Sequence, residues 1–219
     1  IASVHQMLNQ PEQAVETHRR AGEAFRQSGS LDDAACETLA AAGTLAGLVR
    51  LTEARREAQT ACNLAAECGR PDVHARALAL LGHIEGVIGL EDSAEQSIRE
   101  ALRIATENDL THVTVEIHRR LGAVREGTAH FTQARDTYFS TLEQCRRIGA
   151  QEVVLDCLGC LAWALFRVGD WAHSSDVCRD VIRQREAPPY SRGAGIATLG
   201  LIHALRGEFR RARRLWQQL

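Results

Sequence analysis

A small residue recurs in this chain of 219 residues at intervals of 40, and this repeat constrains the fold more than any other feature. A chain built from one repeated unit folds as a stack of that unit, because a single unit cannot bury its own apolar face. The interval of 40 holds for five members and shortens to 38 before the last one. The repeated small residues are Ala14, Ala54, Ala94, Ala134, Ser174 and Ala212.

A second series of small residues lies twelve positions before the later members of the first series. A residue without a bulky side chain lets two backbones approach closely, so we expect both series to lie where helices pack tightly. The members of this second series are Gly82, Gly122, Ala162 and Gly200.

Each repeat has the amino-acid composition of two helices and residues that end helices at the expected positions. Ala, Leu, Arg and Glu dominate, and these are strong helix formers. Gly29, Gly69 and Gly149 stand where helices should end, with Asp109 in the same slot, because a left-handed residue closes a helix there. We therefore predict an all-α fold, a right-handed superhelical solenoid of antiparallel hairpins forming a single domain over residues 1–219. The predicted hairpins cover roughly 31–69, 72–109, 112–149, 151–186 and 189–219, after a partial repeat at 1–29.

The pattern Leu81-Gly82, then Gly89, then Ala94 and Ala101 resembles a tetratricopeptide repeat. The resemblance covers the whole chain, but the period here is 40 instead of the usual ~34. The Pro that closes the consensus repeat is absent. The aromatic residue expected in the first helix is replaced by Leu45, Glu85, Arg125, Leu165 and His203.

The long period, the Ala/Arg-rich composition and the Gly169-Asp170-Trp171 turn resemble one subgroup in particular. This is the repeat region of large LuxR-type transcription regulators of the maltose-regulator kind. The resemblance implies an ATPase module before the repeats and a helix-turn-helix after them. It also implies a non-catalytic sensing role in a cytoplasmic signalling protein, whereas the alternative is a stand-alone scaffold.

No catalytic motif is present, and no cofactor is expected. All 26 basic residues are Arg, so a phosphate-binding loop with its Lys is excluded. Cys157 and Cys160 form a CxxC, and with Cys178 and His173 they suggest a zinc or redox site as an alternative. The seven Cys are an odd number and lie mostly in predicted helices, which favours reduced, buried thiols in the cytoplasm.

The charge and hydropathy of the chain limit the kinds of partner that it is expected to bind. The net charge of −2 argues against direct nucleic-acid binding, and no apolar run reaches the ~20 residues of a membrane span. We expect a protein or peptide partner, or a small-molecule effector. Ile1 and Leu219 fall inside predicted helices, so we also expect either more repeats in a longer protein or a homodimer through the uncapped ends.

In the repeat family the first helices line the concave groove at recurring positions. Small residues at Gly86, Ala123 and Gly159 would leave room there for a ligand. The aromatic residues of the groove have two interpretations, as binding anchors or as packing against the neighbouring repeat. The groove candidates carried over by this resemblance are Arg76, His83, Glu116, Arg119, Glu126, Asp156, Trp163, Phe166 and Arg167.

Overall fold

The computed structural model describes residues 10–219, and this range contains eleven α-helices and no strand. The prediction of an all-α helical repeat is therefore confirmed, while the first nine residues of the predicted partial repeat lie outside the described part. The helices are α2 (Pro11–Ser28), α3 (Leu31–Gly47), α4 (Leu51–Glu67), α5 (Pro71–Val87), α6 (Glu91–Glu107), α7 (Thr111–Gly127), α8 (Phe131–Ile148), α9 (Gln151–Arg167), α10 (Trp171–Arg183), α11 (Pro189–Leu205) and α12 (Phe209–Trp216).

Nine of the connections between these helices close in the same way. A residue with positive φ follows the helix, and the N–H of the next residue donates to the carbonyl five positions back. This Schellman arrangement satisfies the last carbonyls of the helix and reverses the chain within two or three residues. Gly occupies six of the nine positions, and Val49, Asp109 and Ala129 occupy the others with φ of 60°, 54° and 62°. The prediction that Asp109 takes a glycine slot is confirmed.

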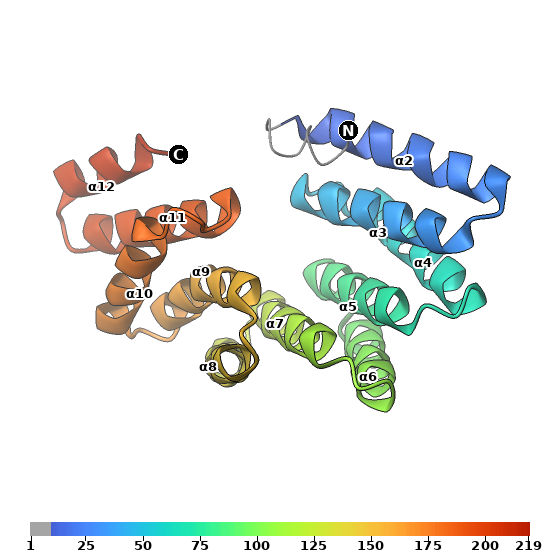
Figure 1. Cartoon of the computed structure of the whole chain (residues 1–219). Coiled ribbons are helices and arrows are strands. Elements are labelled where there is room, and N and C mark those ends of the chain that lie inside the picture. The colour runs from blue at the N-terminus through green and yellow to red at the C-terminus, as the bar shows by residue number, and fades with distance from the viewer. Residues whose placement is uncertain (1–9) are drawn as a thin grey trace. The chain divides into compact units, whose positions relative to one another are not determined.

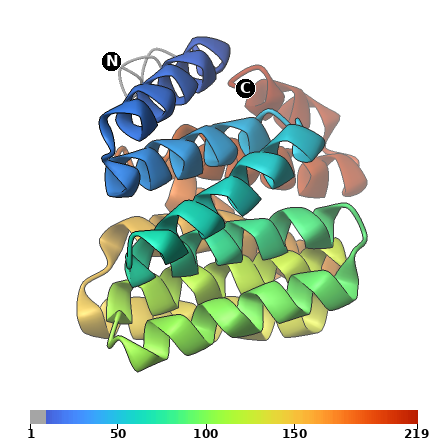
Figure 2. The same cartoon turned by 90° about the vertical axis from the view of Figure 1, so that its right-hand side faces the viewer.

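The first compact unit of the chain ends at Arg120. Within it α2 packs on α3, α3 on α4, α4 on α5 and α5 on α6, so consecutive helices form antiparallel hairpins (Figure 2). The helix pair α3 and α5 is also in contact, which makes the first helices of successive hairpins neighbours. Figure 1 shows α4 and α6 on the same side of α3 and α5. Fully buried Leu45 and Ile84 belong to the core between these layers.

The second compact unit begins at Leu121, within α7, and repeats the same packing scheme. Here α8 contacts α9, α9 contacts α10, α10 contacts α11 and α11 contacts α12 (Figure 1). The helices α9 and α11 adjoin just as α3 and α5 do in the first unit. Tyr138, Leu161 and Leu165 are among the largest fully buried side chains of this unit.

The two series of small residues lie at the contact between the two helices of a hairpin. All six members of the first series are at most 1% exposed. A Cβ atom at Gly82 would lie 2.9 Å from the carbonyl oxygen of Ala94, and one at Gly122 would lie 2.4 Å from the Tyr138 ring. The hydroxyl of Ser174 donates to the carbonyl of Ala162 across the same contact at 2.7 Å. Small residues at these positions are therefore required by close approach of the paired helices.

Polar residues at the usual aromatic position find partners inside the stack. Glu85 is 3% exposed and accepts from the Arg55 guanidinium of α4 at 2.9 Å and from the Ser97 hydroxyl of α6 at 3.0 Å. Arg125 donates to the hydroxyl of Thr137. These bonds satisfy groups that burial would otherwise make unfavourable, so the repeat keeps its packing without the consensus aromatic residue.

The connection after α10 closes differently from the other nine. Within the predicted hairpin of 151–186, α10 ends at Arg183 and Gln184 is extended with ψ of 111°. Pro188 and Pro189 lack the N–H groups that a continuing helix needs, and a residue before Pro disfavours the helical region. Pro189 instead begins α11, where its missing N–H has no consequence.

Candidate functional site

A ladder of charged side chains runs along the first helices of the first unit. The Arg76 guanidinium makes two bonds to the Glu116 carboxylate, at 2.8 and 3.1 Å, between α5 and α7. Arg70 binds Asp72 in the same two-bond manner, at 2.9 and 3.0 Å. Weaker ion pairs of 3.6 Å from Arg76 to Asp72 and 3.8 Å from Arg70 to Asp32 complete the ladder. The Arg76–Glu116 pair joins two successive first helices at positions 40 residues apart in the sequence.

The ladder neutralises its own charges. Hydrogen bonds from Arg70 hold the pKa of Asp72 below its usual range, and hydrogen bonds to Glu116 raise the pKa of Arg76. Each of the two carboxylates has a guanidinium partner in bidentate geometry, the strongest form of this pair. Two of the groove candidates, Arg76 and Glu116, are thus paired with each other, and their first role in the structure is to join α5 to α7.

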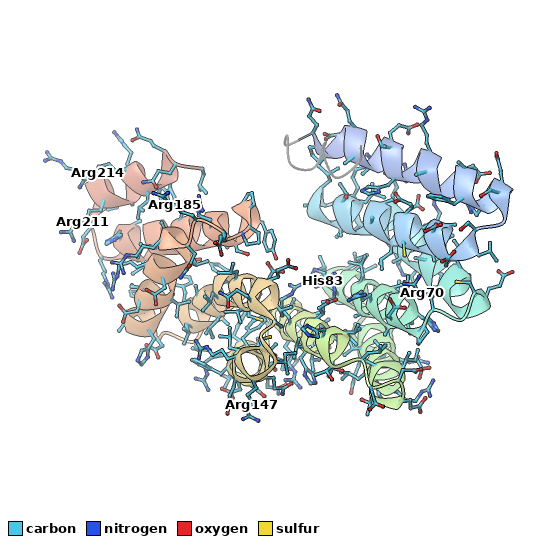
Figure 3. All side chains as sticks on the ribbon, viewed as in Figure 1. Arg70, His83, Arg147, Arg185, Arg211 and Arg214 are labelled. Carbon is cyan, nitrogen blue, oxygen red and sulfur yellow. The ribbon has the colours of Figure 1, made fainter. Side chains whose placement is uncertain are left out.

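His83 is the most strongly perturbed titratable side chain of this face. Burial, followed by the positive charges of Arg120 and Arg119, lowers the pKa of His83 to about 3. Its Nδ1 atom is buried and makes no hydrogen bond with any described residue. Figure 3 marks His83 on α5 and Arg70 just before the same helix. The imidazole is therefore neutral at physiological pH, so it adds a polar but uncharged group to this face.

The second unit carries a cluster of aromatic rings at the turn between α9 and α10. The Trp163 and Phe166 rings are 5.4 Å apart, and the Phe166 and Trp171 rings stack at 5.9 Å. The Arg167 guanidinium lies 3.8 Å above the Phe131 ring and 5.4 Å from the Trp163 ring. All four rings are half-buried, while Arg167 is exposed. We call these five residues the aromatic cluster.

The structure brings together three predicted groove residues and adds two that the sequence interpretation missed. Trp163, Phe166 and Arg167 lie on the last two turns of α9, whereas Phe131 begins α8 and Trp171 begins α10. The two added residues are 40 positions apart, at the first position of successive second helices. That spacing is the signal that could have found them, since both aromatic side chains occupy one repeat position.

The Arg167 guanidinium lies against two aromatic rings. Its Cζ atom lies over the Phe131 ring and near the Trp163 ring, and no ion pair within residues 10–219 connects it to a carboxylate. The neighbouring Asp170 carboxylate is occupied, since it lies 2.7 Å from Nδ1 of His173, which lowers the pKa of Asp170. A guanidinium stacked on rings keeps its in-plane N–H donors free for a carboxylate. The aromatic cluster thus combines apolar rings with the guanidinium of Arg167, which packs against two of them.

The remaining groove candidates are distributed over both units. Arg119 of the first unit, and Glu126 and Asp156 of the second, are partly buried. Gly159 does not provide the room expected for a ligand, because a Cβ atom there would lie 3.0 Å from Cα of Ser191 on α11. The α9–α11 contact covers this glycine, so its small size serves helix packing.

The cysteine residues suggested as a metal or redox site are placed apart from any metal-binding geometry. Cys157 and Cys178 are fully buried, and burial raises the pKa of the Cys178 thiol to about 11. His173 is exposed and bonded to Asp170. Within residues 10–219 no three His, Cys, Asp or Glu side chains are grouped to hold a metal ion.

None of the described helices combines the length and the apolar character that crossing a membrane requires.

No family model matches the sequence, and no curated protein matches it in sequence. Solved structures do match the fold. The Rap protein complexed with Competence and Sporulation Factor aligns with 100% of this chain at 10% identity and a TM-score of 0.80, and the match covers 61% of Rap. NprR in complex with its cognate peptide NprX aligns with 99% of this chain at 11% identity and a TM-score of 0.74, and the match covers 63% of NprR.

A third match is a Signal Transduction ATPase with Numerous Domains that has a tetratricopeptide repeat sensor, from Pyrococcus horikoshii. It aligns with 99% of this chain at 14% identity and a TM-score of 0.62, and the match covers 35% of its length. This chain therefore spans less than two thirds of each of the three proteins, and at these identities the likeness concerns the fold. Residues 10–219 form a tetratricopeptide-like helical repeat domain.

Proposed function

We propose that this chain is a non-catalytic repeat domain that binds a peptide or protein segment, with the aromatic cluster as its principal anchor. The observation that carries this proposal is the Arg167 guanidinium held across Phe131 and Trp163 at a half-exposed surface. Trp and Arg are enriched among residues that dominate binding energy, and such anchors contribute ~2 kcal/mol or more each. Rings that are already packed against each other lose little freedom when a ligand binds.

The similar structures support a recognition role. Rap is bound to Competence and Sporulation Factor, NprR is bound to its cognate peptide, and the ATPase from Pyrococcus horikoshii has a tetratricopeptide repeat sensor. We extend this to a sensing region of a larger cytoplasmic regulator, of the LuxR-type or maltose-regulator kind, in which a bound peptide or small effector alters a neighbouring module.

The second candidate is a stand-alone scaffold, and the coding sequence on both sides of this segment separates the two. An upstream ATPase module with a downstream helix-turn-helix supports the regulator.

The binding role is tested with a phage-displayed library of random linear peptides selected on the chain. We expect selected peptides to bind wild type and to lose at least ~10-fold in affinity on Arg167→Gln, since one anchor contributes more than ~1.4 kcal/mol. Trp163→Ala should weaken binding further. Phe139→Ala is the matched control, because Phe139 is an aromatic residue of the same unit that is 49% exposed and outside the cluster.

Circular dichroism of each variant separates a binding defect from an unfolding defect. Helicity close to wild type with lost binding supports the aromatic cluster as the anchor. Peptides that bind wild type and Arg167→Gln equally, with Arg167→Gln folded, contradict this assignment. A library that yields no binder to the wild-type chain contradicts the peptide-binding role itself.

A further inference from the structure

The charge of the chain is divided unequally along its length. Residues 205–219 contain five arginines and one glutamate, a net +4, so the preceding 204 residues carry a net −6 within the overall −2. The C-terminal segment is therefore basic while the rest of the chain is acidic on average, and local surfaces of opposite sign can steer association.

The turn between α11 and α12 forms a basic edge made of Leu205, Arg206, Phe209, Arg210 and Arg213. Leu205 is 55% exposed and Phe209 is 70% exposed. Within residues 10–219 no ion pair connects Arg206, Arg210 or Arg213 to a carboxylate. A surface hollow of about 600 Å³ is lined in part by Phe209 and Arg210. In Figure 3 the labelled Arg211 and Arg214 of the same helix extend from this region.

The one acidic residue in the turn between α11 and α12 already has cationic partners. Glu208 lies 2.8 Å from the guanidinium of Arg211 and 2.7 Å from Nδ1 of His203. These contacts lower the pKa of Glu208, with Arg211 as the larger cause. Glu208 therefore stays ionised in its own ion pairs, and the arginines of the basic edge keep their charge for a partner.

The turn between α5 and α6 forms an acidic edge made of Val87, Ile88, Leu90, Glu91 and Asp92. The three aliphatic side chains are 46%, 41% and 42% exposed. Glu91 and Asp92 are exposed in the first turn of α6, and neither forms an ion pair within residues 10–219. The acidic edge thus combines apolar surface with unpaired negative charge, as the basic edge combines apolar surface with unpaired positive charge.

The two edges occupy the same place in the repeat with opposite charge. Ala94 and Ala212 are members of the same repeated series, and Asp92 and Arg210 each lie two residues before them. Val87 and Leu205 correspond in the same way. Both edges therefore present an apolar side chain followed, at the start of the next helix, by a charged one. The opposite charges favour a contact between unlike edges over a contact between two like edges.

We propose that these edges dock two copies of this chain, the acidic edge of one copy against the basic edge of the other. The exposed aliphatic and aromatic side chains supply apolar contact area, and the charges select the pairing. Contacts between two acidic edges or two basic edges are disfavoured by like-charge repulsion. Because the contact would involve one turn from each copy, we expect a weak association that is sensitive to salt. None of the aromatic cluster takes part, so this inference is independent of the proposed function.

A charge-reversal experiment tests this pairing. The all-basic variant carries Glu91→Arg and Asp92→Arg, and the all-acidic variant carries Arg210→Glu and Arg213→Glu. Sedimentation velocity at low salt should detect reversible self-association of the wild-type chain across a concentration series. Each variant alone should associate at least ~10-fold more weakly, because both of its edges then have the same sign. An equimolar mixture of the two variants should restore association, since each supplies the sign that the other lacks.

The matched control reverses two exposed acids elsewhere, Glu12→Arg and Glu16→Arg in α2. This control should associate as wild type does, and high salt should weaken every associating sample. A wild-type chain that stays monomeric at low salt overturns the proposal. So does a mixture that stays monomeric while circular dichroism shows both variants to be folded, or a control that loses association as the reversed edges do.

Discussion

At the scale of single residues, nine turns of this chain require a residue with positive φ, and the sequence places Gly at only some of them. Six of the nine helix-closing positions with positive φ are Gly, but Val49 and Ala129 adopt φ of 60° and 62°. The left-handed region is unfavourable for a residue with a Cβ atom, most of all a β-branched one. The hydrogen bond from Arg50 to Leu45 maintains this conformation at Val49.

Replacing Ala129 with Gly should therefore stabilise the protein. The gain is about 0.5–1 kcal/mol, because relief of the left-handed conformation exceeds the extra entropy of Gly in the unfolded chain. The same substitution at Ala24, exposed within α2, should instead destabilise by ~1 kcal/mol. Urea unfolding measures both. Equal effects of the two substitutions would contradict the positive φ at Ala129.

The lowered pKa of His83 predicts that the stability of the protein depends on pH. An unfolded histidine protonates near pH 6.5, whereas folded His83 has its pKa lowered to about 3 by burial and by Arg120 and Arg119. Between these values the unfolded chain binds more protons, so the free energy of unfolding falls as pH decreases through this window. His83→Gln should flatten that slope between about pH 6.5 and pH 4.5.

His173 provides a control, because its pKa is shifted in the opposite direction to that of His83. Asp170 raises its pKa, so this exposed histidine contributes stability below pH 6.5 that is lost as pH rises through its folded pKa. His173→Gln should therefore leave the slope attributed to His83 in place. Urea unfolding across pH measures both variants, and a His83→Gln profile parallel to wild type would show that His83 titrates normally.

At the scale of helices, the fold depends on contacts between the two members of each hairpin. The spacing of the small residues predicted where helices pack closely, because a 40-residue period is visible in the sequence. The partners across each contact were not predictable, since the choice of Tyr138 against Gly122 depends on rotation of one helix about its axis. The pairing of Arg76 with Glu116 likewise becomes visible only once the register of α5 and α7 is known.

Gly122→Ala and Gly43→Ala should have opposite effects. A Cβ atom at Gly122 would lie 2.4 Å from the Tyr138 ring, which is fully buried, so Ala there should destabilise by ~2 kcal/mol. Gly43 lies within α3 with no atom within 4 Å of its Cβ position, so Ala there should stabilise by about 0.5–1 kcal/mol. Thermal unfolding gives the sign directly, and stabilisation by Gly122→Ala would contradict the close packing of α7 on α8.

The ion pair between exposed Arg55 and buried Glu85 should respond unequally to loss of either partner. Arg55→Met leaves the Glu85 carboxylate, 3% exposed, with only the Ser97 hydroxyl, and should destabilise by ~2 kcal/mol. Glu85→Leu places an apolar side chain at the usual aromatic position and leaves a half-exposed arginine, so it should change stability by less than ~1 kcal/mol. The double variant should resemble Glu85→Leu in urea unfolding. A larger loss from Glu85→Leu than from Arg55→Met would contradict this order.

At the scale of the whole molecule, the chain repeats one hairpin while its surface differs from repeat to repeat. The fold class was predictable because repetition, helix propensity and turn residues all indicate the same architecture. The separation into units at Arg120 and Leu121 was not, since no change of composition marks it. The aromatic cluster was predicted in part, because Phe131 and Trp171 join it from other helices.

The most direct test of the central claim, that the aromatic cluster binds a peptide, is amide hydrogen exchange with and without a peptide selected on the chain. We expect added protection at the start of α8 and at the turn between α9 and α10, where Phe131, Trp163 and Trp171 lie. The Arg167→Gln variant should lose this protection at the same peptide concentration. Protection confined to the first unit, or unchanged by Arg167→Gln, would contradict the assignment of the binding site.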